Sequence, residues 1–192
     1  WNRLVRRFMQ HHQAQTPYFL QLPAEFLDFL QNEYEPGADD FPFLVELAHY
    51  EYIELALSVS EESNDLEGVD PDGDLLAGVP VKSTLAWVYA YQFPVHRISA
   101  EFLPDAPAEQ PVYLAVYRDA EDRVGFLELN AVTAGLLNAI QENDAGHSGE
   151  ALLRKLAADI NYPDIDAFIA HGLAAMQEMR SLDILTGTRS AG

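Results

Sequence analysis

Residues 84–93 and 112–118 each alternate between two sets of side chains, and residues 124–129 form a short apolar run. Because successive side chains of a strand point to opposite faces, the alternation predicts two β-strands, and the short run predicts a third. Polar residues 119–122 separate the second stretch from the third and suit a tight hairpin loop. The sequence therefore predicts a small sheet whose last two strands form a hairpin.

The apolar period changes to three or four residues at Asn130, which predicts that helices follow the sheet. Asn130 is the expected N-cap of the first helix, and Thr133 takes that role if the helix begins later. Ser148 caps the second helix, and Asp164 or Asp166 caps the third. The positions expected to face the core are Val132, Leu136, Leu137, Ile140, Leu152, Leu153, Leu156, Ile160, Ile165, Phe168, Ile169, Leu173, Met176 and Met179.

Three further helices are predicted in the N-terminal part of the chain, where apolar residues again recur at helical spacing. The first ends at Thr16-Pro17, because the residue before a proline is disfavoured in helical geometry. Asp39 or Asp40 is the expected N-cap of the third helix, which extends to Ser60. This part of the chain is therefore predicted to be helical.

An acidic segment containing glycine and proline, residues 60–78, has few large apolar residues and is predicted to be a linker. We therefore divide the chain into a helical segment, residues 1–62, an acidic linker, residues 63–79, and a second domain, residues 80–192. Residues 186–192 are expected to form a polar tail. The predicted fold class is α+β, with the helical segment followed by a winged-helix-like β-β-β-α-α-α domain.

The charge of the chain bears on its partners. It has 31 acidic and 11 basic residues and a formal net charge of −20. Such a chain repels phosphate backbones, which argues against nucleic acid as a partner and favours a basic peptide or protein, although the charge also serves solubility. The absence of cysteine excludes disulfides and thiolate chemistry. No apolar run is long enough to span a membrane, and we expect a cytoplasmic protein.

Two groups of residues have part of the spacing of a metal site. Glu46 and His49 have the spacing of one carboxylate–histidine pair, but no second copy follows, so a solvated polar face is predicted. Asp70, Asp72 and Asp74 have the spacing of a calcium loop, which lacks the required glycine and the final glutamate. Phosphate-binding loops and nucleophile elbows are also absent from the sequence. We therefore expect no catalytic residues, no metal and no cofactor.

The C-terminal part resembles the PqqD-type recognition elements of pathways that modify ribosomally made peptides (RiPPs). The resemblance covers roughly residues 84–185. It implies a peptide-recognition domain, and it is carried by the order and spacing of Leu129, Asn130, Ala134, Leu137, Leu153, Leu156, Ile169, Met176 and Leu185.

Residues 4–30 and 73–98 resemble the HvfC/BufC family, formerly labelled putative DNA-binding proteins. The most specific matches are Pro17-Tyr18 and the Phe-Pro-Val-His run at residues 93–96. The resemblance implies a non-catalytic chaperone that presents a precursor peptide, commonly containing cysteine, to a multinuclear non-haem iron oxidative enzyme, often for copper handling. It also implies that helices of the family's N-terminal domain precede Trp1.

In recognition elements of this type the peptide lies between the third strand and the third helix. Transferred to this chain, the resemblance implies a strand edge facing part of the last predicted helix. Gly172, Ala174 and Ala175 are small and are expected to leave a shallow groove there. The predicted pairing edge is Gly125, Phe126, Leu127 and Glu128, and the opposite wall is Phe168, His171, Ala175 and Glu178. A packing role stays open for Phe126 and Phe168.

A DNA-binding transcriptional regulator is the alternative interpretation, because a three-helix unit with a hairpin is also the pattern of a winged helix. The charge of the last predicted helix distinguishes the two functions. It carries Asp164, Asp166 and Glu178 against Arg180, and this excess of acidic residues repels DNA. A peptide-binding adaptor is therefore the preferred prediction.

Overall fold

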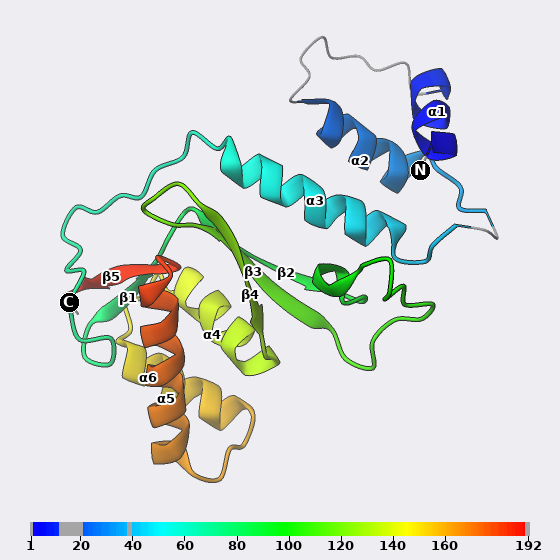
Figure 1. Ribbon diagram of the computed structural model, residues 1–192. Coiled ribbons are helices and arrows are strands. Elements are labelled where there is room, and N and C mark those ends of the chain that lie inside the picture. Colours follow the sequence, from blue (N-terminus) through cyan, green and yellow to red (C-terminus); the bar gives the residue numbers. More distant parts are fainter. Residues whose placement is uncertain (1, 12–20, 38–39, 191–192) are drawn as a thin grey trace. The chain divides into compact units, whose positions relative to one another are not determined.

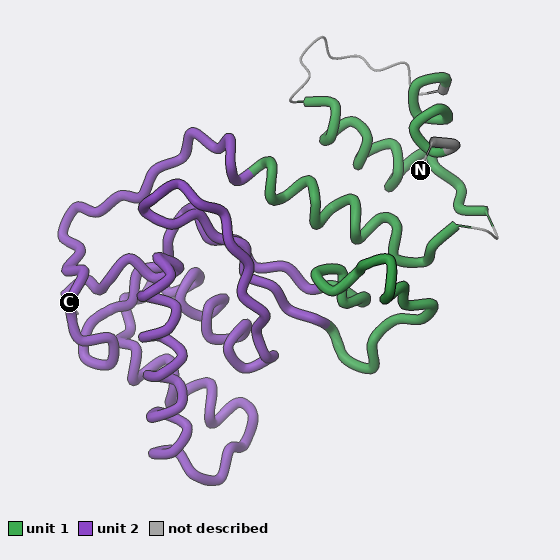
Figure 2. Tube along the Cα trace, in the orientation of Figure 1, with its two compact units in different colours: residues 1–56, 91–111 green, residues 57–90, 112–192 purple. Residues whose placement is uncertain are grey.

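The computed structural model describes residues 2–11, 21–37 and 40–190. Its chain forms two compact units, residues 1–56 with 91–111 and residues 57–90 with 112–192 (Figure 2). The described residues contain six α-helices and five strands in two small sheets, which confirms the α+β class. The predictions that involve Thr16-Pro17, Pro17-Tyr18 and Asp39 fall outside the described residues.

The first unit is mainly helical. Its core is a cluster of buried residues from the first two helices and the residues that follow them: Leu4, Phe8, Phe29, Leu30 and Tyr34. The segment after the second strand contributes Phe93, whose ring lies edge-on to that of Phe43 with 6.2 Å between centroids. The elements are α1 (Asn2–His11), α2 (Leu22–Asn32), α3 (Leu44–Ser58), whose last residues belong to the second unit, and the 3₁₀-helix η2 (Val95–Arg97).

The second unit combines a three-stranded sheet, ordered β2-β3-β4, with a two-stranded sheet, β1-β5 (Figure 1). A single apolar core joins Ala86, Ala115 and Leu129 of the larger sheet to the three helices that follow it. The elements are β1 (Val79–Lys82), β2 (Ala86–Tyr91), β3 (Val112–Arg118), β4 (Val124–Leu129), α4 (Ala131–Gln141), α5 (Gly149–Asp159), α6 (Ile165–Ser181) and β5 (Leu185–Arg189).

The three predicted N-caps of the second unit are confirmed. Asn130 Oδ1 accepts the N–H of Thr133 at 2.9 Å, Ser148 Oγ that of Ala151 at 3.3 Å, and Asp164 Oδ1 that of Ala167 at 3.0 Å. Each bond satisfies one of the backbone donors that the first turn of a helix leaves without a partner. Three positions predicted to be buried are instead exposed, namely Val132, Ile160 and Ile165, at 39%, 45% and 41%.

The prediction of a polar tail after the last helix is wrong. Residues 185–189 form β5, which pairs antiparallel with β1 in the register Val79↔Arg189, Pro80↔Thr188 and Val81↔Gly187. Thr188 is buried, and its N–H and C=O bond to the backbone of Asp70. The sequence did not indicate this strand, because Leu185 is its one large apolar residue and threonine, glycine and arginine follow it.

The acidic segment predicted as a linker is packed against the second unit over residues 70–78. Leu75 is 2% exposed and belongs to the core. Asp74 Oδ1 accepts the N–H groups of Leu76 and Ala77, and these bonds, led by that from Ala77, lower the pKa of the Asp74 carboxyl. Arg180 of α6 donates to the carbonyl of Gly73 at 2.9 Å. The segment therefore supplies structure to this unit.

Two predictions for α3 are corrected. Asp40 does not cap the helix from its N-cap position, because α3 begins at Leu44 and Asp40 Oδ2 accepts the N–H of Gly37, at 2.7 Å. Glu46 and His49 do not form a solvated face: Glu46 accepts two backbone N–H groups, as described below, and His49 Nδ1 lies 2.9 Å from the hydroxyl of Tyr91. Burial lowers the pKa of His49, and nearby Glu46 opposes this effect.

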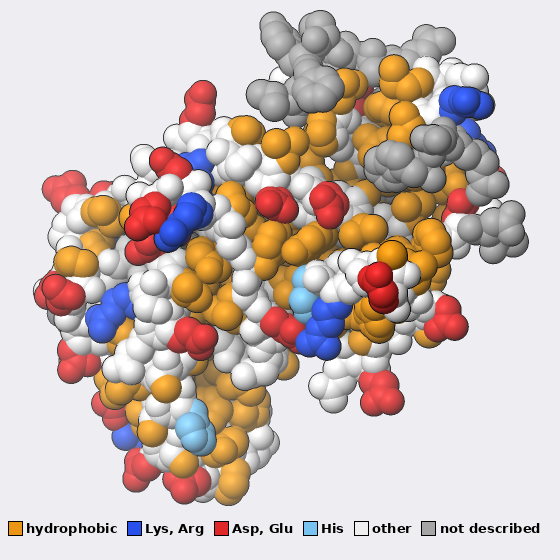
Figure 3. Space-filling view, viewed as in Figure 1, with side chains coloured by type: hydrophobic (Ala, Val, Ile, Leu, Met, Phe, Trp, Pro, Cys, Tyr) orange, Lys and Arg blue, Asp and Glu red, His pale blue; other side chains and the backbone are white. Residues whose placement is uncertain are grey.

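Acidic side chains are spread over the visible face of the molecule, with fewer basic ones among them (Figure 3). In the part of the chain that the structure describes, no group of three or more histidine, aspartate or glutamate side chains is placed to hold a metal ion. No helix of the described residues is long and apolar enough to cross a membrane.

Candidate peptide-binding edge

Strand β4 carries the four residues of the predicted pairing edge and lies at one end of its sheet. It pairs with β3 in the register Ala115↔Leu127 and Val116↔Phe126. Leu127 packs against the core, whereas Phe126 and Glu128 belong to the opposite face because side chains alternate along a strand. Within this sheet β4 pairs on one side only, which is the arrangement that an added strand needs.

The predicted opposite wall is one stripe of α6, because Phe168, His171, Ala175 and Glu178 follow each other at intervals of three or four residues. These four side chains differ in how far they are buried. Phe168 is 6% exposed, belongs to the core and packs against Tyr162 with 5.0 Å between ring centroids. Ala175 is half-buried, and His171 and Glu178 are exposed. The last three are therefore the ones available to a guest.

A cavity of about 480 Å³ lies where the start of β4 approaches the end of α6. Of the eight predicted site residues, Gly125 lines it and the other seven do not. The structure thus brings the β4 edge together with the end of α6 rather than with its middle. The lining residues are Tyr117, Asp119, Ala120, Glu121, Arg123, Val124, Gly125, Ser181, Leu182 and Asp183.

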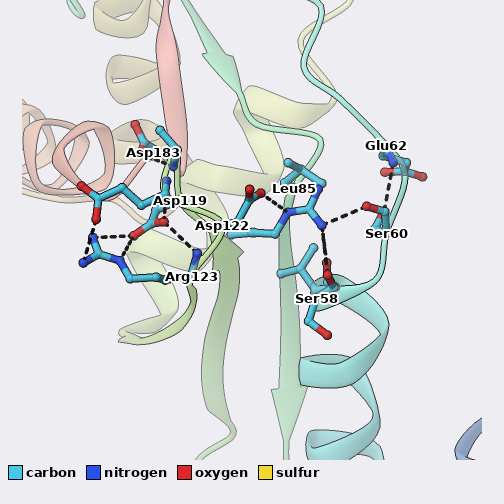
Figure 4. A network of polar contacts seen from close by, with 12 residues as sticks. Ser58, Ser60, Glu62, Leu85, Asp119, Asp122, Arg123 and Asp183 are labelled. Atoms are coloured by element: carbon cyan, nitrogen blue, oxygen red, sulfur yellow. Dashed lines mark hydrogen bonds and ion pairs between the residues drawn. The ribbon is translucent and has the colours of Figure 1, made fainter. Parts of the chain in front are cut away.

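The hairpin loop beside this cavity is held rigidly by Asp119 (Figure 4). Its carboxylate accepts the N–H groups of Glu121 and Arg123, both at 2.9 Å, and Nε of Arg123 at 2.8 Å. The backbone bond from Arg123 is the main cause that lowers the pKa of Asp119. Asp183, after α6, accepts the N–H of Ala120 at 2.9 Å and so ties the helix end to the loop.

Glycine is required at position 125 by the neighbouring strand. A Cβ added there would lie 2.6 Å from the ring of Tyr117, which faces Gly125 across the pair. The sequence placed the glycine on a strand but did not indicate that Tyr117 would lie over it. The sequence analysis did not place Tyr117, Asp119 or Asp183 at this cavity. The polar hairpin loop was a signal for Asp119, and nothing in the sequence indicated Asp183.

Gly172 does not leave a groove, contrary to the prediction. A Cβ at Gly172 would lie 2.3 Å from Cδ2 of Leu153, so the side chain of Leu153 in α5 already fills the space over this glycine. The small residue serves close packing between α5 and α6.

We expect Gly172→Ala to destabilise the protein by about 1–3 kcal/mol, because an extra methyl in a packed core forces its neighbours to shift. Urea denaturation followed by circular dichroism measures the change. The double variant Gly172→Ala/Leu153→Ala, which removes the obstructing side chain, is the control. If the clash with Leu153 is the cause, the alanine at 172 costs less in the Leu153→Ala background than in the parent.

Part of the chain matches a known protein family. The family described as the HvfC C-terminal domain matches residues 83–180, slightly more than half of the chain. The matched part runs from just before β2 to the last turn of α6 and includes all eight predicted site residues, whereas β1 and β5 lie outside it. No curated protein matches the chain.

Proposed function

The chain belongs to the HvfC family, and from this premise we propose that it is a non-catalytic adaptor that binds a ribosomally made precursor peptide. The peptide adds to β4 as a further strand in a winged-helix-like recognition domain. The protein then presents the peptide, which contains cysteine, to a multinuclear non-haem iron oxidative enzyme. Iron and the oxidation of cysteine belong to that partner enzyme, and this chain supplies binding and orientation alone.

The observation that carries the proposal is the terminal position of β4 beside a cavity that contains Gly125. A guest strand gains affinity from main-chain hydrogen bonds and specificity from pockets that receive alternate side chains. Arg123, Asp119 and Asp183 make the cavity polar, so a guest residue with a hydrogen-bonding side chain suits it. Because Asp119 and Asp183 fix the loop, the edge is ordered before the guest arrives, which reduces the entropic cost of binding.

The first test fills the cavity between the start of β4 and the end of α6. We expect Ser181→Trp to weaken binding of a synthetic cysteine-containing precursor peptide at least tenfold, because Ser181 lines this cavity and the indole occupies the guest's position. Ala170→Trp is the matched control, since Ala170 is exposed on the same helix and does not line the cavity. Titration by NMR gives both the affinity and the location of the guest through the amide signals of residues 124–129.

Chemical-shift changes confined to α1 and α2, with none along β4, would contradict the proposal. Equal weakening by the two tryptophan variants would also contradict it, because the effect would then be unrelated to the groove. The same samples test the absence of catalysis: the mass of the peptide should stay unchanged with this protein alone and change only when the iron enzyme is added.

A further inference from the structure

The second unit has a larger cavity, of about 660 Å³, at the other end of its three-stranded sheet. This volume lies in the range of about 300–1,000 Å³ that is typical of ligand sites. None of the proposed peptide-binding residues lines it. The lining residues are Val79, Pro80, Val81, Lys82, Ser83, Thr84, Trp87, Val88, Tyr89, Ile140, Gln141, Asn143 and Arg189.

The cavity runs along the edges of two strands. Three successive residues of β2, Trp87 to Tyr89, and all four residues of β1 border it. Because successive side chains point to opposite faces of a strand, a cavity that touches consecutive residues lies along the strand's edge. β2 is the terminal strand of one sheet, and β1 pairs only with β5 in the other. The cavity is therefore a slot whose walls include strand backbone, which suits an extended peptide.

The charge in this slot is opposite to that of the chain as a whole. Its charged lining residues are Lys82 and Arg189, and no aspartate or glutamate lines it, although the net charge is −20. Arg189 donates to the Asp65 carboxylate at 3.4 Å on the protein's surface. The slot is thus a local positive site on an acidic protein, where a negatively charged group is attracted.

Among the residues that line the slot, Lys82 is distinctive because its ammonium group has no partner among the described residues. The chain has two lysines, and the other, Lys155, pairs with Asp159 at 2.8 Å. Lys82 is half-buried, and the structure gives its ammonium group no hydrogen bond or ion pair with any described residue. Burial lowers the pKa of its ammonium group, with no nearby carboxylate to oppose this effect. A half-buried ammonium without a partner is unfavourable for folding, and a bound carboxylate relieves the cost.

We propose that the slot between β1 and β2 is a second peptide site, which binds an extended acidic segment with one carboxylate on Lys82. Trp87 supplies an apolar wall, and its indole N–H, which donates to the carbonyl of Thr84 at 3.1 Å, holds the ring in place. The preferred segment alternates acidic and apolar residues, because one face of an added strand meets Lys82 and the other meets the aromatic wall. This site is independent of the β4 edge.

The two lysines allow a direct test. Reductive methylation with ¹³C-formaldehyde keeps their charge and gives separate NMR signals for Lys82 and Lys155, assigned with Lys82→Met and Lys155→Met. The probe is a capped hexapeptide that alternates valine and glutamate, compared with its glutamine counterpart and with inorganic phosphate. We expect the glutamate peptide to shift the Lys82 signal and not the Lys155 signal, and to bind at least tenfold more tightly than the glutamine peptide.

Lys82→Met should remove this preference for glutamate, whereas Lys82→Arg and Lys155→Met should keep it. Because Lys82→Met removes an unpaired half-buried charge, the variant should fold at least as well as the parent. Equal binding of the two peptides, an effect of phosphate equal to that of the glutamate peptide, or unchanged preference in Lys82→Met would each overturn the proposal. Ser181→Trp should leave this binding intact, which separates the second site from the β4 edge.

Discussion

Gly149→Ala should destabilise the second unit by about 3 kcal/mol or more, which is the upper range for adding a methyl group to a packed site. A Cβ at Gly149 would lie 1.9 Å from the carbonyl oxygen of Leu75. This obstacle is backbone and cannot rotate away. The N–H groups of Gly149 and Glu150 also donate to the carbonyls of Gly78 and Leu76, both at 3.0 Å, so a shift that relieves the clash breaks these bonds.

Gly135→Ala is the matched control, because Gly135 also lies in a helix but has room for a methyl group. The nearest atom to a Cβ there is Cδ1 of Leu156 at 3.7 Å, which is ordinary contact. We expect this variant to stabilise the protein by about 0.5–1 kcal/mol through the higher helix propensity of alanine. Urea denaturation of both variants measures the two changes. Equal stability of Gly149→Ala and the parent would show that residues 75–78 do not pack on α5 as described.

The elements that could be predicted from the sequence are those determined by neighbouring residues. Asn130, Ser148 and Asp164 cap helices through bonds to residues three positions ahead, and the Asp119 loop closes on itself within five residues. Such contacts depend on the local sequence alone. The hairpin β3–β4 and the three helices that follow were therefore predicted with nearly the right ends.

The features that could not be predicted are those made by residues far apart in the chain. β5 pairs with β1 more than one hundred residues earlier, and each strand alone is too short to indicate its partner. Leu75 is one of few apolar residues in an acidic segment. It is buried in the structure, where the first turn of α5 bonds to the carbonyls of the neighbouring Leu76 and Gly78. The spacing of apolar residues indicates which face of a helix or strand is buried. It does not indicate which distant part of the chain packs against that face.

The same distinction applies to the candidate site. Alternation and helical spacing placed Gly125 on a strand and Ala175 on a helix, and the structure has both elements there. The space left between these elements could not be predicted, because side chains from other elements fill it. Leu153 occupies the position over Gly172, and Tyr117 lies over Gly125. The slot beside Lys82 was missed entirely, because it requires both β1 and the open edge of β2. Sequence reasoning therefore located the elements of a site better than its cavities.

Glu46→Ala is expected to release the start of residues 91–111, the second segment of the first unit, from α3. Oε1 of Glu46 accepts the N–H of Gln92 and Oε2 accepts that of Phe93, both at 2.9 Å. A hydrogen bond to a charged group contributes about 1.5–3 kcal/mol, and truncation leaves both donors without this acceptor. We expect a loss of about 3 kcal/mol in the local stability of this segment.

Amide hydrogen exchange at Gln92 and Phe93 measures this loss directly. Glu46→Gln should have an intermediate effect, because its carboxamide oxygen accepts one N–H while its NH₂ group cannot accept the other. Glu54→Ala is the control, since Glu54 is exposed on the same helix and should change the exchange by no more than about 0.5 kcal/mol. Exchange at residues 92 and 93 that is as slow in Glu46→Ala as in the parent would mean that the apolar contact of Phe93 with Phe43, rather than the carboxylate, holds this segment to α3.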